Sequence, residues 1–115
     1  MTSLEARTLT PEEVAAFGRE PLLFNWGVIY NGEPVACFQA EAERGGVLNV
    51  HATVRRGLHP QVTRAYARRF SEELLCRGAA SLICRIPRTN RAAIRMATAA
   101  GYVKEGADGE DEVLR

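Results

Sequence analysis

The chain has 115 residues, of which 46% are hydrophobic and 25% are charged, and its formal net charge is +1. These values are ordinary for a globular protein and exclude a disordered chain, and the length predicts one domain that spans residues 1–115. No segment has the composition of a membrane-spanning helix or a secretory signal peptide, so we expect a cytoplasmic protein without membrane partners.

The charges are unevenly distributed along the chain. Ten arginines and only two acidic residues lie between Arg55 and Arg95, whereas residues 105–112 contain five acids and no base. The basic segment favours an anionic partner, either a phosphate-bearing small molecule or a nucleic acid. Nucleic acid is the less favoured of the two, because the arginines are spread over several predicted elements without an RNA-binding or DNA-reading motif.

The three cysteines do not indicate a disulfide framework or a metal site. Cys37, Cys76 and Cys84 form no C-x-x-C pair, and neither histidine lies at a zinc-like spacing from them. We therefore expect three buried, reduced thiols and no metal ion.

A weak strand and a short helix are predicted at the start of the chain. Ser3–Thr8 alternates weakly between polar and apolar residues. Thr10 supplies a capping hydroxyl and Pro11 suits the first position of a helix, which Gly18 then ends.

Three strands follow and predict an antiparallel meander. Leu23–Tyr30 and Val35–Ala42 are strand-like runs, and the Asn31-Gly32 dipeptide between them is a strong hairpin signal because both residues tolerate positive φ. Val47–Val54 alternates cleanly and places His51 on its polar face.

The second half of the chain predicts two helices and three short strands. The longer helix begins at Pro60 and runs to about Arg77, with apolar residues at a spacing of four, which are Val62, Tyr66, Phe70 and Leu74. The remaining predicted elements are a strand at Ala80–Ile86, a helix at Asn90–Ala100 ended by Gly101, a strand at Tyr102–Lys104 and a strand at Glu112–Arg115.

The order β-α-β-β-β-α-β-α-β-β indicates an α/β (α+β) fold, in which helices pack on a mixed, mostly antiparallel sheet. A strand, a crossover helix and a second strand in one sheet imply a parallel pair between Val47–Val54 and Ala80–Ile86. The helix between them then starts beside the end of a central strand. Its first backbone amides lack partners within the helix and favour an anion, so a pyrophosphate could bind at Gln61, Val62, Thr63 and Arg64.

Five residues between Ile86 and Gly106 stand in the order N-x-x-A-I followed by glycine and an aromatic residue, and they are Asn90, Ala93, Ile94, Gly101 and Tyr102. This segment resembles the signature of the GNAT superfamily of acetyl-CoA-dependent N-acetyltransferases. The upstream order of elements is similar too, with one helix fewer before the hairpin. The resemblance implies a single GNAT-like acyl-CoA-binding domain that moves an acetyl group from acetyl-CoA to a primary amine by direct transfer, without a metal.

The same resemblance implies where acetyl-CoA would bind. Val54 and its neighbours would meet the pantetheine arm through backbone hydrogen bonds, and the Asn90 side chain would touch the cofactor. The pyrophosphate would lie against His59, Gln61, Val62, Thr63 and Arg64. In GNAT proteins this loop has the pattern Arg-Gly-x-Gly-x-Gly, of which the chain keeps only Gly57. Asn90 is also a plausible helix N-cap, and capping is compatible with cofactor contact.

His51 is the candidate general base for the amine, because an imidazole can exchange protons near neutral pH and the residue lies on the polar face of a central strand. The alternative is a half-exposed strand histidine with no role in catalysis. In many GNAT proteins a Tyr seven residues after the signature Asn acts as the general acid. The chain has Ala97 at that position, so the resemblance assigns no general acid.

Further interpretations stay open at this stage. The eroded loop and Ala97 are also compatible with a catalytically inactive GNAT-like binding or assembly module. The apolar residues near the start of the first hairpin predict either core residues or the contact of a homodimer, and they are Leu22, Leu23, Phe24 and Trp26. No motif specifies the amine acceptor, which is a small molecule, a peptide or a protein.

Overall fold

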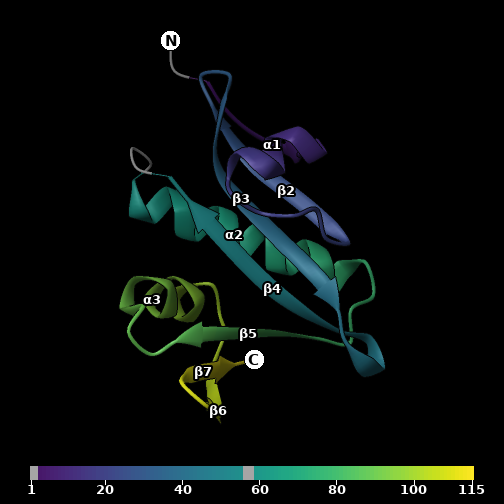
Figure 1. Ribbon diagram of the computed structural model, residues 1–115, viewed down its shortest axis with the longest axis vertical. Helices are drawn as coiled ribbons and strands as arrows, with labels where there is room; N and C mark the ends of the chain where they lie inside the picture. Colours follow the sequence, from purple (N-terminus) through teal and green to yellow (C-terminus); the bar gives the residue numbers. More distant parts are fainter. Residues whose placement is uncertain (1–2, 56–58) are drawn as a thin grey trace.

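The computed structural model of the protein describes residues 3–55 and 59–115, so Gly57 lies outside the described residues. Seven strands form a mixed sheet in the order β1-β2-β3-β4-β5-β7-β6 (Figure 1). They are β1 (Leu4–Thr8), β2 (Phe24–Tyr30), β3 (Glu33–Ala42), β4 (Val47–Val54), β5 (Ser81–Pro87), β6 (Lys104–Asp108) and β7 (Asp111–Leu114). The helices are α1 (Pro11–Ala16), α2 (Pro60–Cys76) and α3 (Arg91–Ala99), with a 3₁₀ turn, η1, at Arg44–Gly46. The predicted order of helices and strands is confirmed.

Local signals in the first third of the chain act as the sequence predicts. The Thr10 hydroxyl accepts a hydrogen bond from the Glu13 amide at 3.2 Å, and the Glu13 carboxylate accepts one from the Thr10 amide at 2.9 Å, which is a complete capping box. Asn31 and Gly32 have φ values of 49° and 83°, the left-handed conformation that a tight hairpin between β2 and β3 requires.

Helices cover both faces of the sheet. The main core lies under α2 and α3, and its large members include Val28, Phe38, Phe70, Leu74, Leu82 and Leu114. The Trp26 ring stacks on the Phe70 ring with centroids 5.7 Å apart. A smaller core lies under α1 on the opposite face and consists of Leu9, Val14, Ile29 and Cys37. Because neighbouring strand residues point to opposite faces, β2 and β3 contribute to both cores.

Strands β4 and β5 form the predicted parallel pair, but they separate after its first residues. The register joins Val47 to Ser81 and continues only to the pair of Asn49 and Ile83. From Cys84 onward β5 pairs with β7, while β4 stays paired with β3 up to Val54. Figure 1 shows the two strands side by side at one end and diverging toward α3. The β5-side edge of β4 from residue 50 to residue 54 is therefore open.

The prediction of the apolar side of α2 needs correction. The buried residues of α2 are Thr63, Ala67, Phe70, Ser71 and Leu74, so the apolar stripe predicted from Val62 and Tyr66 is rotated, and these two are only half-buried. The helix presents small side chains where α3 and the segment after it approach closely, and the Ser71 hydroxyl lies 3.0 Å from that of Tyr102.

The strand predicted at Tyr102–Lys104 is wrong at its start. Gly101 has a φ of 106°, and the Tyr102 amide donates to the Ala97 carbonyl at 3.1 Å, so both residues belong to the end of α3. The Tyr102 side chain enters the core, and β6 begins only at Lys104.

The cysteine prediction holds for two of three residues. Cys37 and Cys84 are buried, whereas Cys76 is exposed because it occupies the last position of α2 on its solvent side, and all three are free thiols. Among the described residues, no helix combines the length and the apolar character needed to cross a membrane.

Candidate functional site

Two cavities with a shared boundary lie beside the part of β4 that has separated from β5. We call the first the outer groove; it has a volume of about 420 Å³ and is lined by Ala52, Val54, Pro60, Thr63, Arg64, Asn90, Ala92, Ala93, Arg95 and Met96. The second, the inner cavity, has a volume of about 150 Å³ and shares Ala52, Asn90, Ala93 and Met96 with the outer groove. The outer groove thus lies between the start of α2 and the start of α3 and borders the inner cavity.

The start of α2 is already capped by its own side chain. His59 is the N-cap, and its Nδ1 accepts a hydrogen bond from the Gln61 amide at 3.1 Å. The Val62 and Thr63 amides both donate to the His59 carbonyl, at 3.0 Å and 3.1 Å, and Pro60 has no amide proton. An anion at this helix start would have to replace the His59 ring at the Gln61 amide. The positive charge available to it comes from Arg64 and Arg95, which line the outer groove.

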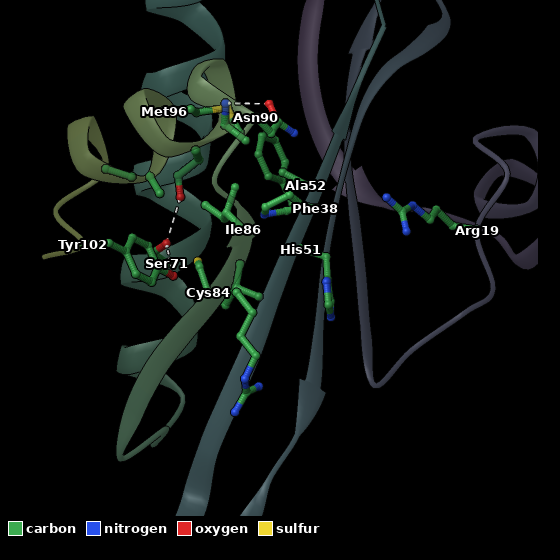
Figure 2. A pocket seen from close by; sticks show the side chains of 17 residues that line it. Arg19, Phe38, His51, Ala52, Ser71, Cys84, Ile86, Asn90, Met96 and Tyr102 are labelled. Atoms are coloured by element: carbon green, nitrogen blue, oxygen red, sulfur yellow. Dashed lines mark hydrogen bonds between the residues drawn. The ribbon is translucent and has the colours of Figure 1, made fainter. Parts of the chain in front are cut away.

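Asn90 lies where the two cavities meet. It is the N-cap of α3, and its Oδ1 accepts a hydrogen bond from the Ala93 amide at 3.2 Å. Figure 2 shows this bond beside Met96, near Ala52 on β4. The predicted capping role is confirmed, and the same side chain lines both cavities.

The helix side of the inner cavity is apolar and ends in weakly acidic groups. Ser71 donates to the Ala67 carbonyl at 3.1 Å, and its oxygen lies 3.0 Å from the Tyr102 hydroxyl. Burial raises the pKa of the Cys84 thiol to about 12 and raises the pKa of the Tyr102 hydroxyl above its ordinary value. Both groups are therefore neutral at physiological pH. Ala97 also lines the cavity and contributes no polar atom there.

His51 lines the inner cavity from the opposite face of the sheet. Figure 2 shows His51 and Arg19 across β4 from the side chains that belong to α3. The His51 Nε2 lies 3.0 Å from a Glu41 carboxylate oxygen, which also accepts a hydrogen bond from the Asn49 side-chain amide at 3.3 Å. Asn49 is only 7% exposed, so it holds Glu41 from within the protein.

The segment between α1 and β2 is fastened beside His51. The buried Gln39 side chain donates to the Glu20 carbonyl at 2.7 Å and to the Asn25 side-chain oxygen at 3.0 Å. Gln39 is the register partner of His51, so this segment crosses the sheet next to the imidazole. Arg19 donates to the Thr53 hydroxyl at 3.0 Å and closes the same side of the cavity.

A charged cluster borders His51 toward β5. Arg85 forms an ion pair with Glu43, and its Nε lies 3.8 Å from an Asp108 carboxylate oxygen. The hydrogen bond from Arg85 holds the pKa of Glu43 below its ordinary value, and the same contact raises the pKa of Arg85. The positive charge of Arg85 is therefore balanced by acidic side chains of the protein. Glu41 and Asp108 add further negative charge around His51.

The structure separates the predicted site residues into three places. Val54, Thr63, Arg64 and Asn90 line the outer groove. His59, Gln61 and Val62 form the capped helix start next to it, and the lining of the groove does not include them. His51 lines the inner cavity on the other face of the sheet.

Sequence reasoning missed Glu41, Gln39 and Asn49. The signal was present, because an antiparallel pairing of β3 with β4 places polar residues of matching parity on one face. Only the register that joins Gln39 to His51 shows that Glu41 reaches the imidazole. Within residues 3–55 and 59–115, no group of three or more His, Cys, Asp or Glu side chains is arranged to hold a metal ion.

Comparison with known proteins identifies the fold. No protein-family model matches the sequence, and no curated protein matches it significantly. Among solved structures, the PaiA N-acetyltransferase from Thermoplasma acidophilum, in complex with coenzyme A, matches with a TM-score of 0.78 over 97% of both chains at 10% identity. An acetyltransferase of the GNAT family from Streptococcus pneumoniae matches with a TM-score of 0.72, over 97% of this chain and 96% of that one, at 14% identity. The protein has the GNAT fold.

The GNAT fold is also that of a third neighbour, the aminoglycoside acetyltransferase AAC(6')-Ib in complex with coenzyme A. It matches with a TM-score of 0.73 over 98% of this chain and 94% of that one, at 16% identity. The predicted mixed sheet with helices packed on it is therefore confirmed, and so is the resemblance in architecture. At these identities the neighbours establish the fold alone.

Proposed function

We propose that the protein is an acetyl-CoA-dependent N-acetyltransferase that transfers an acetyl group directly to a primary amine. The observation that carries the proposal is a pair of cavities with a common boundary at Asn90, one lined by Arg64 of α2 and Arg95 of α3, and the other lined by His51 on the opposite face of the sheet. Such an arrangement would let a cosubstrate and an acceptor meet from opposite faces of the sheet. Neighbours with the same fold that were solved with coenzyme A support this choice of cosubstrate.

The outer groove offers what the coenzyme needs. Arg64 and Arg95 would balance the charge of the phosphates, and the open edge of β4 near Val54 would offer backbone groups to the amides of the pantetheine arm. Asn90 would contact the arm where the groove enters the inner cavity. The Gln61 amide would exchange its bond with the His59 ring for a bond with a phosphate oxygen.

His51 would act as the general base. With Nε2 directed at Glu41, the imidazole presents Nδ1 as the atom that accepts the proton lost by the amine as it attacks the thioester carbonyl. Glu41 would fix the tautomer and stabilise the charge that the ring gains. The new amide bond forms as the carbon–sulfur bond breaks, and the electron pair leaves on sulfur. Cys84 and Tyr102 would not protonate it, because burial makes both weaker acids than usual.

The test is turnover of acetyl-CoA with a broad panel of amines, measured by the release of free coenzyme A thiol. His51→Gln should lower kcat by about 10² or more. Glu41→Gln should lower kcat less, whereas Glu33→Gln, an exposed change on the same strand, should have no effect. Binding of acetyl-CoA should be unchanged in all three variants. An unchanged kcat in His51→Gln would remove the histidine from the mechanism.

A catalytically inactive binding module is the second candidate. The observation that favours it is the self-capped start of α2, in which His59 already occupies the Gln61 amide that a phosphate would need. If no amine in the panel is acetylated, whether or not coenzyme A binds, the enzyme assignment should be abandoned in favour of this one.

A further inference from the structure

The inner cavity is larger than the reacting group of acetyl-CoA requires. Its volume of about 150 Å³ equals that of an apolar protein cavity that binds benzene, a ligand of six heavy atoms. The thioester end of acetyl-CoA contributes only a sulfur, a carbonyl group and a methyl group. Room for about two further carbon atoms would therefore remain beyond the methyl carbon.

Part of the lining of the inner cavity lies on its helix side. Six residues there, which we call the inner recess, line the inner cavity but not the outer groove, and they are Ala67, Ser71, Cys84, Ala97, Ala100 and Tyr102. Figure 2 shows Ser71, Cys84 and Tyr102 on the side of β4 that faces the helices, away from His51. An amine that approaches His51 would leave the recess free, and so would a pantetheine arm in the outer groove.

The chemistry of the recess favours an uncharged, aliphatic occupant. Three of its six residues are alanines, and Ala67 and Ala97 are each only 8% exposed. Ser71 is engaged by the Ala67 carbonyl and the Tyr102 hydroxyl, and neither Cys84 nor Tyr102 is ionised near neutral pH. The recess contains no cation, so a carboxylate at the end of an acyl chain would be buried without a partner.

We propose that the inner recess receives the acyl chain of the cosubstrate, and that the protein binds coenzyme A thioesters of unbranched three- and four-carbon acyl groups more tightly than acetyl-CoA. This inference rests on the proposed acyl transfer. Atoms and electrons balance as in acetyl transfer. The amine nitrogen bonds to the acyl carbon, the carbon–sulfur bond breaks, and the proton that the amine loses ends on the sulfur of coenzyme A, which leaves as the thiol. Burial of each added methylene contributes about 0.8 kcal/mol, or about fourfold in affinity.

The test needs no knowledge of the acceptor. Calorimetric titration of the wild-type protein with acetyl-, propionyl-, butyryl- and succinyl-CoA should show affinity rising about fourfold with each methylene from acetyl to butyryl. Succinyl-CoA should bind more weakly than butyryl-CoA, because its carboxylate would enter an apolar space.

Variants place the effect in the recess. Ala97→Leu fills the space beside Tyr102 and should reduce the butyryl-to-acetyl affinity ratio from about 15 to near one. Ala99→Leu makes the same change on the exposed side of α3 and should leave the ratio as in the wild type. If Ala97→Leu does not fold, Ala97→Val should lower the ratio in part.

The outcomes separate this inference from the proposed function. Equal affinity for all three unbranched acyl-CoAs in the wild-type protein would overturn the inference while leaving acetyl transfer in place. A rising series that Ala97→Leu leaves unchanged would also overturn it, because the chain would then bind elsewhere. Failure of every coenzyme A compound to bind would overturn the proposed function itself.

Discussion

His51 and Glu41 owe their contact to the register of two neighbouring strands. Gln39 pairs with His51 and Glu41 pairs with Asn49, so the glutamate reaches the imidazole diagonally while Asn49 supports it from the side. The two strands that carry these side chains are brought together by the pairing of β3 with β4. No local sequence motif therefore shows that Glu41 contacts His51. The burial of the three cysteines is likewise set by the tertiary structure, because nothing in the sequence distinguishes the exposed Cys76 from the buried Cys37 and Cys84.

The cysteines should differ sharply in reactivity. Burial raises the pKa of Cys37 to about 11 and that of Cys84 to about 12, so at pH 8 only about one Cys37 thiol in a thousand would be ionised. Cys76 is exposed. Iodoacetamide should therefore add one label to the folded protein, at Cys76, and three to the denatured protein, as read by mass spectrometry. Rapid labelling of Cys84 in the folded state would contradict the described core.

Glu13 should make the stability of the protein sensitive to acid. Hydrogen bonds from Arg7, at 2.7 Å and 2.8 Å, lower the pKa of Glu13 to about 2. A carboxyl group with a lowered pKa in the folded state stabilises the protein above its unfolded pKa of about 4.3, and this contribution is lost as the pH falls toward 2.

Glu13→Gln tests this contribution, because glutamine keeps the capping geometry and removes the charge. The substitution should lower Tm at pH 7 by about 1–4 °C, as expected for an exposed ion pair, and the difference should vanish near pH 2. A difference that stays constant between pH 7 and pH 2 would assign the effect to the cap instead of the charge.

At the scale of helices and strands, the boundaries with local causes could be predicted and those with distant causes could not. Thr10, Asn31-Gly32 and Asn90 act through neighbours in sequence, and each forms the cap or turn expected of it. Tyr102 has the composition of a strand residue but is drawn into the core, where its hydroxyl meets Ser71 of α2. That contact joins positions 31 residues apart, so no local pattern shows it.

The close approach of β2 to the segment before α1 gives a second test at this scale. A Cβ atom added at Gly27 would lie 2.3 Å from the nearest atom of the Leu9 side chain, which is buried in the smaller core. Gly27→Ala should therefore lower the free energy of unfolding by about 1–3 kcal/mol, measured by urea denaturation.

Gly106→Ala is the matched control for this test. Gly106 lies in a strand, has no positive φ and has open space at the Cβ position, so its replacement should change stability by no more than about 0.5 kcal/mol. Equal effects of the two substitutions would mean that Leu9 does not pack over β2 as described.

At the scale of the whole molecule, the site depends on the separation of β4 from β5. The crossover helix and its strands predict that these two strands are parallel neighbours, and the sequence supports this much. The divergence arises because β5 pairs from Cys84 onward with β7, which comes from the end of the chain. The arrangement of the two cavities is therefore a tertiary property. The unpaired amides of a helix start predicted Thr63 and Arg64 and the polar face of a strand predicted His51, whereas Val54 was predicted only through the resemblance to a known family.

The central claim is that the outer groove holds the phosphates of an acyl-CoA, and calorimetric titration with acetyl-CoA and with coenzyme A tests it most directly. Arg64 lines the groove, whereas Arg68, one turn later in α2, is exposed and pairs with Glu72. We expect micromolar binding, a loss of about tenfold or more in Arg64→Glu, and no change in Arg68→Glu, because a charge-assisted contact is worth about 1.5–3 kcal/mol. No binding of either compound, or equal loss in both variants, would contradict the account.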